Sequence, residues 1–169
     1  MNVKRLSEMQ KVLDDRIMKE HELENKDLEE NKILALLVEI SELANETRCF
    51  KHWSKKGPSE ESIILEEYVD SLHFFLSIAN HHRYDVDRLY SQYLSDFNPN
   101  DNPETLVTAF KDIMTKILKM EVKQDRYHYI DAFSAYLTIG KMLGFSWEKI
   151  EQAYVRKNEI NHNRQDNGY

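Results

Sequence analysis

Residues 33–46 read ILALLVEISELANE, and residues 63–76 read IILEEYVDSLHFFL. In both stretches apolar side chains recur every three or four positions, which places them on one face of an α-helix. Gly57 and Pro58 lie between the stretches and favour a break in the helix. The sequence therefore predicts two amphipathic helices, which a short connection over residues 55–59 turns back against each other.

The same periodicity continues through almost the whole chain and predicts an all-α fold, a helical bundle. Gly144 is expected to end one helix, while Ser59 and Ser146 are expected to cap the starts of two others. A polar turn is expected near Gln124, and residues 98–103 (NPNDNP) form the clearest predicted loop. The helices are expected over residues 3–24, about 33–46, 60–81, 85–96, 104–122, 126–143, and from Ser146 to about Asn161.

The composition fits one helical domain over residues 1–169. Four glycines and three prolines supply few of the tight turns that an all-β fold needs. The net charge of −7 argues against non-specific binding to nucleic acid. The single cysteine, Cys49, excludes an intrachain disulfide and a cysteine-rich zinc site.

Other features of the sequence concern location and partners. The N-terminal residues MNVKRLSEMQ lack the apolar core of a signal peptide, and no stretch approaches the roughly 20 apolar residues of a membrane span. A cytoplasmic protein without a membrane partner is therefore expected. Long amphipathic helices commonly pair with another chain, so a homodimer is expected, and a regulatory protein partner is left open.

Two pairs of acids share one spacing. Glu39 and Glu42 are three residues apart, as are Glu67 and Asp70. Residues at this spacing lie on the same side of a helix, and here they lie among core-facing residues. Antiparallel packing of the two helices would bring the pairs face to face, as in the carboxylate sites of helical bundles.

Clustered acids need a compensating positive charge, because burying unpaired carboxylates is costly. Mg²⁺ prefers oxygen ligands and bridges to substrate phosphates, so the pattern predicts a magnesium site. Two other interpretations stay open at this point. The acids can be ordinary surface charges, or His73, three residues after Asp70, can complete a di-iron site. The first acidic helix offers no matching histidine, which favours ligation by oxygen alone.

Two further motifs accompany the acids. The four elements are Glu39-x-x-Glu42, Phe50-Lys51-His52-Trp53-Ser54, Glu67-x-x-Asp70 followed by Ser71-Leu72-His73-Phe74, and Tyr154-x-x-Lys157-Asn158-x-x-Asn161-x-x-Arg164-Gln165. Together they resemble the dimeric all-α deoxyuridine triphosphatases (dUTPases), relatives of the MazG-like nucleoside triphosphate pyrophosphatases. The acids by themselves are typical of the wider superfamily, whereas the second and fourth elements narrow the resemblance to the dUTPases.

The resemblance implies hydrolysis of dUTP to dUMP and pyrophosphate, and also of dUDP to dUMP, with two or more Mg²⁺ ions. By motif match the metal ligands would be Glu39, Glu42, Glu67 and Asp70. Glu66 is an alternative to Glu67 in a different register. Glu39 or Glu42 would orient and deprotonate the attacking water, whose pKa a bound metal lowers.

The resemblance also implies how the nucleoside binds. Gln10 resembles the amide that reads uracil, and Leu13 or Asp14 stands where a second polar contact such as asparagine is expected. Trp53 and Phe74 fit nucleoside recognition, by stacking on a base or by contact with the deoxyribose that excludes a 2′-hydroxyl. The alternative is that both rings belong to the core.

Basic residues are expected to contact the phosphates. Lys51 and Lys56 crowd the end of the second helix, where cations also complement the helix dipole without any ligand. Residues 157–169 are expected to form a C-terminal tail that closes over the substrate rather than a frayed polar end. Its expected substrate contacts are Lys157, Asn161 and Arg164.

Two other classes of function remain open. One is a MazG-like pyrophosphatase that acts on dCTP or on several nucleotides, in which the pocket around Gln10, Trp53 and Phe74 would differ. The other is a non-catalytic helical interaction or regulatory protein whose acids are surface charges.

Overall fold

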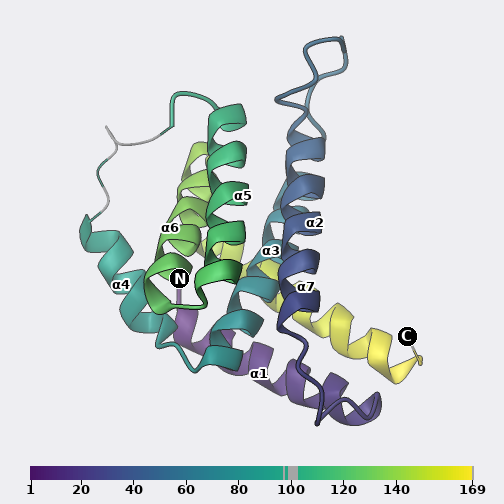
Figure 1. The fold of residues 1–169 in the computed structure, drawn as a ribbon. Helices are drawn as coiled ribbons and strands as arrows, with labels where there is room; N and C mark the ends of the chain where they lie inside the picture. Colours follow the sequence, from purple (N-terminus) through teal and green to yellow (C-terminus); the bar gives the residue numbers. More distant parts are fainter. Residues whose placement is uncertain (97, 99–102, 169) are drawn as a thin grey trace.

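The computed structural model describes residues 1–96, 98 and 103–168, and this part of the chain forms seven α-helices and no strand (Figure 1). The predicted all-α fold is confirmed. The predicted loop over residues 98–103 falls mostly outside the described residues, as does the last residue of the predicted tail. The helices are α1 (Val3–Glu20), α2 (Glu29–Thr47), α3 (Glu61–His82), α4 (Val86–Asp96), α5 (Leu106–Lys123), α6 (Arg126–Met142) and α7 (Trp147–Asp166).

Most predicted helix ends agree with the structure. Gly144 follows α6 with φ of +79°, and the Ser146 hydroxyl accepts a hydrogen bond from the Lys149 amide at the start of α7. The cap predicted for Ser59 is wrong. Glu60 occupies the N-cap position of α3 without a side-chain bond, while the Ser59 hydroxyl donates to the carboxylate of Glu46.

Three helices differ in length from the prediction. Helix α2 begins at Glu29, four residues before the predicted start at residue 33. Helix α1 ends at Glu20, before the predicted residue 24. Helix α7 continues to Asp166, beyond the predicted end at residue 161. Arg16 explains the longer α7, because its guanidinium donates to the carbonyl of His162 at 3.1 Å and pairs with Asp166 at 2.6 Å. This contact with α1 holds the last turns of a polar helix that the sequence pattern does not predict.

Helix α3 lies at the centre of the bundle. It runs antiparallel to α2, and α1, α2 and α7 all pack against it (Figure 1). Helices α5 and α6 form a second antiparallel pair beside α2. Aromatic packing joins α3 to α6, since the Tyr68 ring stacks on Tyr136 at 4.4 Å and the Tyr136 hydroxyl donates to the Tyr68 carbonyl. The direct packing of α2 on α3 holds the acidic faces of these two helices opposite each other.

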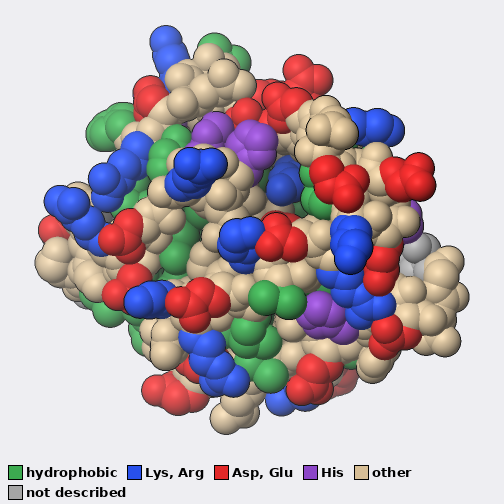
Figure 2. All heavy atoms as spheres, turned by 90° about the horizontal axis from the view of Figure 1, so that it is seen from below, with side chains coloured by type: hydrophobic (Ala, Val, Ile, Leu, Met, Phe, Trp, Pro, Cys, Tyr) green, Lys and Arg blue, Asp and Glu red, His purple; other side chains and the backbone are tan. Residues whose placement is uncertain are grey.

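The surface carries charges of both signs. Figure 2 shows the face seen from below, where lysines and arginines alternate with acids and histidines lie between them. This face therefore offers no continuous basic surface. None of the described helices combines the length and the apolar composition that crossing a membrane requires.

Candidate active site

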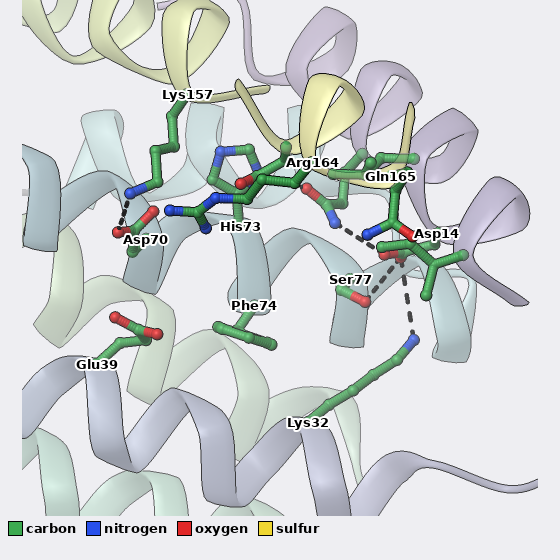
Figure 3. Close-up of a pocket in the computed structure, with 14 residues that line it drawn as sticks. Asp14, Lys32, Glu39, Asp70, His73, Phe74, Ser77, Lys157, Arg164 and Gln165 are labelled. Atoms are coloured by element: carbon green, nitrogen blue, oxygen red, sulfur yellow. Dashed lines mark hydrogen bonds and ion pairs between the residues drawn. The ribbon is translucent and has the colours of Figure 1, made fainter. Parts of the chain in front are cut away.

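Helices α2 and α3 bring three of the predicted acids together. Glu39 comes from α2, and Glu67 and Asp70 come from successive turns of α3. One carboxylate oxygen of each lies within 4.8 Å of the others. Figure 3 shows the Glu39 side chain reaching from α2 toward Asp70, whose carboxylate faces Lys157. We refer to these three residues as the acid cluster.

The acid cluster carries more negative charge than its surroundings neutralise. Burial and the neighbouring charges of Asp70 and Glu42 raise the pKa of Glu39 to about 7. Burial, followed by the charges of Asp70 and Glu42, also raises the pKa of Glu67 to about 7. Such shifts mean that the ionised forms are poorly compensated by the protein itself. Closely spaced carboxylate oxygens whose negative charge the protein does not compensate suit a hard divalent cation.

Glu42 lies at the edge of the acid cluster. Its side chain is exposed, and it does not belong to the group of three converging carboxylates. Its charge nevertheless contributes to the raised pKa values of both Glu39 and Glu67. If Glu42 acts as a metal ligand or as a general base, it does so from the solvent-exposed edge of the acid cluster.

Lys157 connects α7 to the acid cluster. Its ammonium lies 2.7 Å from Asp70 and 2.8 Å from Glu66, and the residue is only 7% exposed. Burial opposes the charged form, but the two carboxylates outweigh it and raise the pKa of Lys157. The pKa of Asp70 is still raised, because burial exceeds the opposing effect of Lys157. Glu66 lies outside the group of three converging carboxylates, so the geometry favours Glu67 over Glu66 as the metal ligand.

A pocket of about 370 Å³ opens beside the acid cluster between α1, α2, α3 and α7. Its volume falls in the range of small-molecule sites. Figure 3 shows Glu39 and Asp70 at one end and Asp14 with Lys32 at the other. Five of the eight predicted substrate-binding residues line it: Gln10, Phe74, Lys157, Asn161 and Arg164.

The amide of Gln10 is held in one orientation. Its oxygen accepts hydrogen bonds from His73 Nδ1 at 2.7 Å and from the Tyr154 hydroxyl at 2.8 Å. Burial lowers the pKa of His73 to about 3, so the ring is neutral and Nδ1 carries its single proton. The amide nitrogen donates to Asp14 at 2.8 Å, which leaves its second hydrogen for a ligand. His73 therefore orients Gln10 and is not part of the acid cluster.

Two pocket residues, Lys32 and Ser77, were not identified from the sequence, and Asp14 was named only as one of two residues where a second polar contact is expected. Asp14 accepts from Gln10 and from the Ser77 hydroxyl at 2.7 Å, and Lys32 approaches it to 3.9 Å. Burial raises the pKa of Asp14 despite the opposing charge of Lys32. Helical spacing could have indicated two of these residues. Asp14 follows Gln10 by one turn and Lys32 precedes Glu39 by two turns, so each lies on the same side of its helix as a predicted site residue. The contact between Asp14 and Ser77 joins α1 to α3 and has no signal in local sequence.

The other three predicted substrate residues, Lys51, Trp53 and Lys56, lie outside the pocket of their own chain. They belong to the α2–α3 loop, which extends beyond the ends of both helices (Figure 1). Trp53 is 67% exposed and makes edge contacts with Phe50 and His52. The interpretation of Trp53 as a core residue is therefore wrong, and the structure shows an aromatic loop tip directed into solvent.

The raised pKa values predict how stability depends on pH when no divalent cation is present. Glu39 and Glu67 ionise near pH 4.5 when unfolded and at about pH 7 when folded, so the folded state binds more protons in this window. The free energy of unfolding should fall as pH rises from about 4.5 to 7. After allowance for solvent screening, we expect a change on the order of 1 kcal/mol, or roughly 2–4 °C in melting temperature.

Thermal melts in a chelator across this pH range measure the effect. Glu39→Gln should flatten the dependence, whereas Glu30→Gln, an exposed acid on the same helix, should leave it unchanged. An unaltered slope in Glu39→Gln would show that the acid cluster is not the source.

Comparison with known protein families agrees with this architecture. A family model described as dUTPase matches residues 2–169, almost the whole chain. No curated protein sequence matches the chain with significant similarity. The family match identifies an enzyme, a dUTP diphosphatase, and removes the non-catalytic interpretation. With its all-helical structure, the chain belongs to the all-α dUTPase family.

Proposed function

We propose that the pocket hydrolyses dUTP to dUMP and pyrophosphate, and dUDP to dUMP, in a cytoplasmic homodimer that uses Mg²⁺. The observation that carries the proposal is the acid cluster at one end of a pocket whose other end presents an oriented amide. Glu39, Glu67 and Asp70, with Glu42 at the rim, would hold two or more Mg²⁺ ions. When bound, magnesium would lower the pKa of the water that it coordinates and would neutralise negative charge on the phosphates.

Glu39 or Glu42 is the proposed general base. Glu39 belongs to the acid cluster, so its carboxylate lies beside the position where a bound cation would hold the attacking water. Glu42 lies one turn further along α2 on the solvent side, where an attacking water has access. Either carboxylate would orient the water and take its proton, while the others keep their oxygens directed at the cation site.

The polar end of the pocket fits uracil. Gln10 offers an N–H for a base carbonyl, and Asp14 offers carboxylate oxygens for the N3–H of uracil. Cytosine carries an acceptor at N3, so a carboxylate at Asp14 would disfavour it. Phe74 is half-buried, packs against the core and lines the same pocket. Its ring is proposed to lie against the deoxyribose and exclude a 2′-hydroxyl.

Helix α7 supplies the proposed phosphate contacts. Lys157 already lies against the acid cluster, and Asn161 and Arg164 line the pocket on the following turns. The charge of Arg164 acts on the pKa of Asp70, which places the guanidinium within electrostatic reach of the cluster. In this proposal the tail predicted over residues 157–169 closes over the substrate, and residues 157–166 do so as the last turns of α7.

A homodimer accounts for the loop residues that lie outside the pocket. Leu34 and Val38 are exposed one turn apart on α2, and Leu118 and Val122 are exposed one turn apart on the adjacent α5. Pairing of such faces would bury apolar area and favour association. The projecting loop of one protomer would then reach the pocket of its partner, and Lys51, Trp53 and Lys56 would act there.

Glu42→Gln should abolish hydrolysis and leave the helical fold intact. Loss of a general base or metal ligand is expected to lower kcat by roughly 10²–10⁴-fold. Pyrophosphate release from dUTP with Mg²⁺ measures the rate, and circular dichroism measures the helix content. Glu30→Gln serves as the matched control on α2. Activity retained in Glu42→Gln would remove the proposed role of this residue.

The uracil proposal predicts a substrate order. With Mg²⁺, dUTP should turn over faster than dCTP, dTTP or UTP, and equal rates would favour a broad MazG-like pyrophosphatase instead. Asp14→Asn should lower the ratio of kcat/KM for dUTP over dCTP by about tenfold, since one mismatched buried contact is worth roughly 1–3 kcal/mol. Asp15→Asn, an exposed neighbour, is the control. An unchanged ratio in Asp14→Asn would place base selection elsewhere.

Mixing two impaired variants tests the shared site. Trp53→Ala should lower turnover although the ring lies outside the pocket of its own chain. If the loop acts across the dimer, refolding Trp53→Ala together with Glu42→Gln should restore activity, because the mixed dimer contains one site with both residues intact. Refolding each variant alone is the control. Absence of any restoration, with a dimer confirmed by sedimentation, would show that Trp53 does not act in the partner's site.

A further inference from the structure

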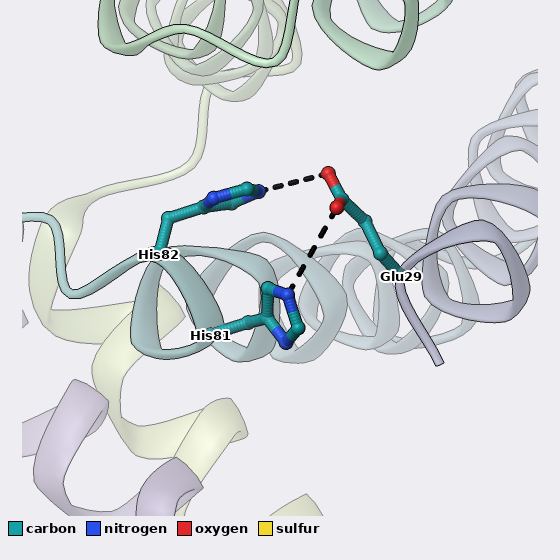
Figure 4. A group of neighbouring side chains, drawn as sticks. All are labelled: Glu29, His81 and His82. Atoms are coloured by element: carbon teal, nitrogen blue, oxygen red, sulfur yellow. Dashed lines mark hydrogen bonds and ion pairs between the residues drawn. The ribbon is translucent and has the colours of Figure 1, made fainter. Parts of the chain in front are cut away.

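The start of α2 and the end of α3 bring one carboxylate and two imidazoles together, as Figure 4 shows. Glu29 lies in the first turn of α2, and His81 and His82 lie in the last turn of α3. His82 Nε2 is 2.8 Å from one oxygen of Glu29, and His81 Nε2 is 3.9 Å from the other. The three potential ligand atoms all lie within 4.8 Å of one another.

The charge on Glu29 lacks a permanent counterion in this arrangement. The residue is 9% exposed, and its ion pairs within the described part of the chain are with the two histidines. Its remaining side-chain contact comes from the amide of Gln124 at 3.3 Å. A carboxylate with so little exposure is costly unless a cation compensates it. The histidines supply that charge only when they are protonated.

We propose that Glu29, His81 and His82 form a second cation site, which binds a divalent transition-metal ion of the Zn²⁺ type. Imidazole nitrogen with a carboxylate is a donor set that suits Zn²⁺, whereas Mg²⁺ prefers oxygen ligands and retained waters. Asp27 lies nearby, with one oxygen 4.0 Å from His81 Nε2, so a fourth ligand is available from the same segment. Otherwise water completes the coordination.

Neighbouring groups hold these ligands in place. The His82 ring stacks on Tyr84 at 5.1 Å, and Gln124 bonds to Glu29. Such supporting contacts orient metal ligands in known sites. Coordination needs the Nε2 lone pair, so each ring must carry its proton on Nδ1, and any second proton is released to solvent.

This site is separate from the acid cluster. Glu29 precedes Glu39 by ten residues on α2, which corresponds to about 15 Å along the helix axis. A metal ion here would link α2 to α3 across 53 residues of sequence. The ion would hold the start of α2 against the end of α3, which is the end of this helix pair opposite the α2–α3 loop. The proposed hydrolysis does not require this ion.

Calorimetric titration of the intact protein with Zn²⁺, in excess Mg²⁺ to occupy the acid cluster, tests the proposal. One Zn²⁺ should bind per chain, and His81→Asn with His82→Asn should weaken binding by at least about tenfold. His52→Asn, an exposed histidine in the α2–α3 loop, is the matched control and should bind normally. Glu39→Gln should also bind normally. Unchanged binding in the double histidine variant, or loss of binding in Glu39→Gln, would overturn the proposal.

A second measurement needs no variant. Nitrogen-15 NMR of the histidine rings in the wild-type chain should show the Nε2 signals of His81 and His82 shifting on addition of Zn²⁺, while the signals of His52 stay in place. Zn²⁺ should also raise the melting temperature of the wild type and leave that of the double variant unchanged. Shifts confined to other histidines would contradict the assignment of these ligands.

Discussion

The juxtaposition of Glu39 with Glu67 and Asp70 is the constraint on which the rest of the site depends. Three partly buried carboxylates within 4.8 Å of one another repel, and the fold tolerates them because α2 and α3 are fixed by the apolar core on their other sides. Lys157 relieves part of the repulsion but leaves the pKa values of the acids raised. The uncompensated negative charge that destabilises the metal-free protein is the property that would suit the acid cluster to a divalent cation, and a phosphate chain would bind there only through that cation.

At the other end of the pocket the polar side chains form a hydrogen-bonded network, in which His73 Nε2 is, among the described residues of this network, the one buried atom without a partner. Tyr154 and His73 both donate to Gln10, and Gln10 and Ser77 both donate to Asp14. These residues come from α1, α3 and α7, so the network also ties the three helices together. A hydrogen-bonded network of this kind presents a fixed set of donors and acceptors, which base discrimination requires. The pocket thus combines one end with uncompensated negative charge and one end with a hydrogen-bonded polar network.

Much of the fold and part of the site follow from local sequence. Apolar periodicity predicted the helices, because burial of one face is set by spacing of three and four residues. The acid pairs could be assigned to facing helices since one short connection joins α2 and α3. The extent of α7 could not be predicted, because Arg16 on α1 holds its polar last turns. The cap expected at Ser59 failed for a similar reason, since Glu46 across the loop engages its hydroxyl.

The sequence by itself determined the all-α class, the acids on two consecutive helices and, through its motifs, the relation to dUTPases. Only the tertiary structure decided that Glu42 lies at the rim, that Asp14 and Lys32 share the pocket with Gln10, and that Trp53 projects away from it. It also placed Glu29 beside His81 and His82. The physical reason is that helical periodicity fixes which side of a helix a residue occupies. The partner that it meets depends on how helices distant in sequence pack together.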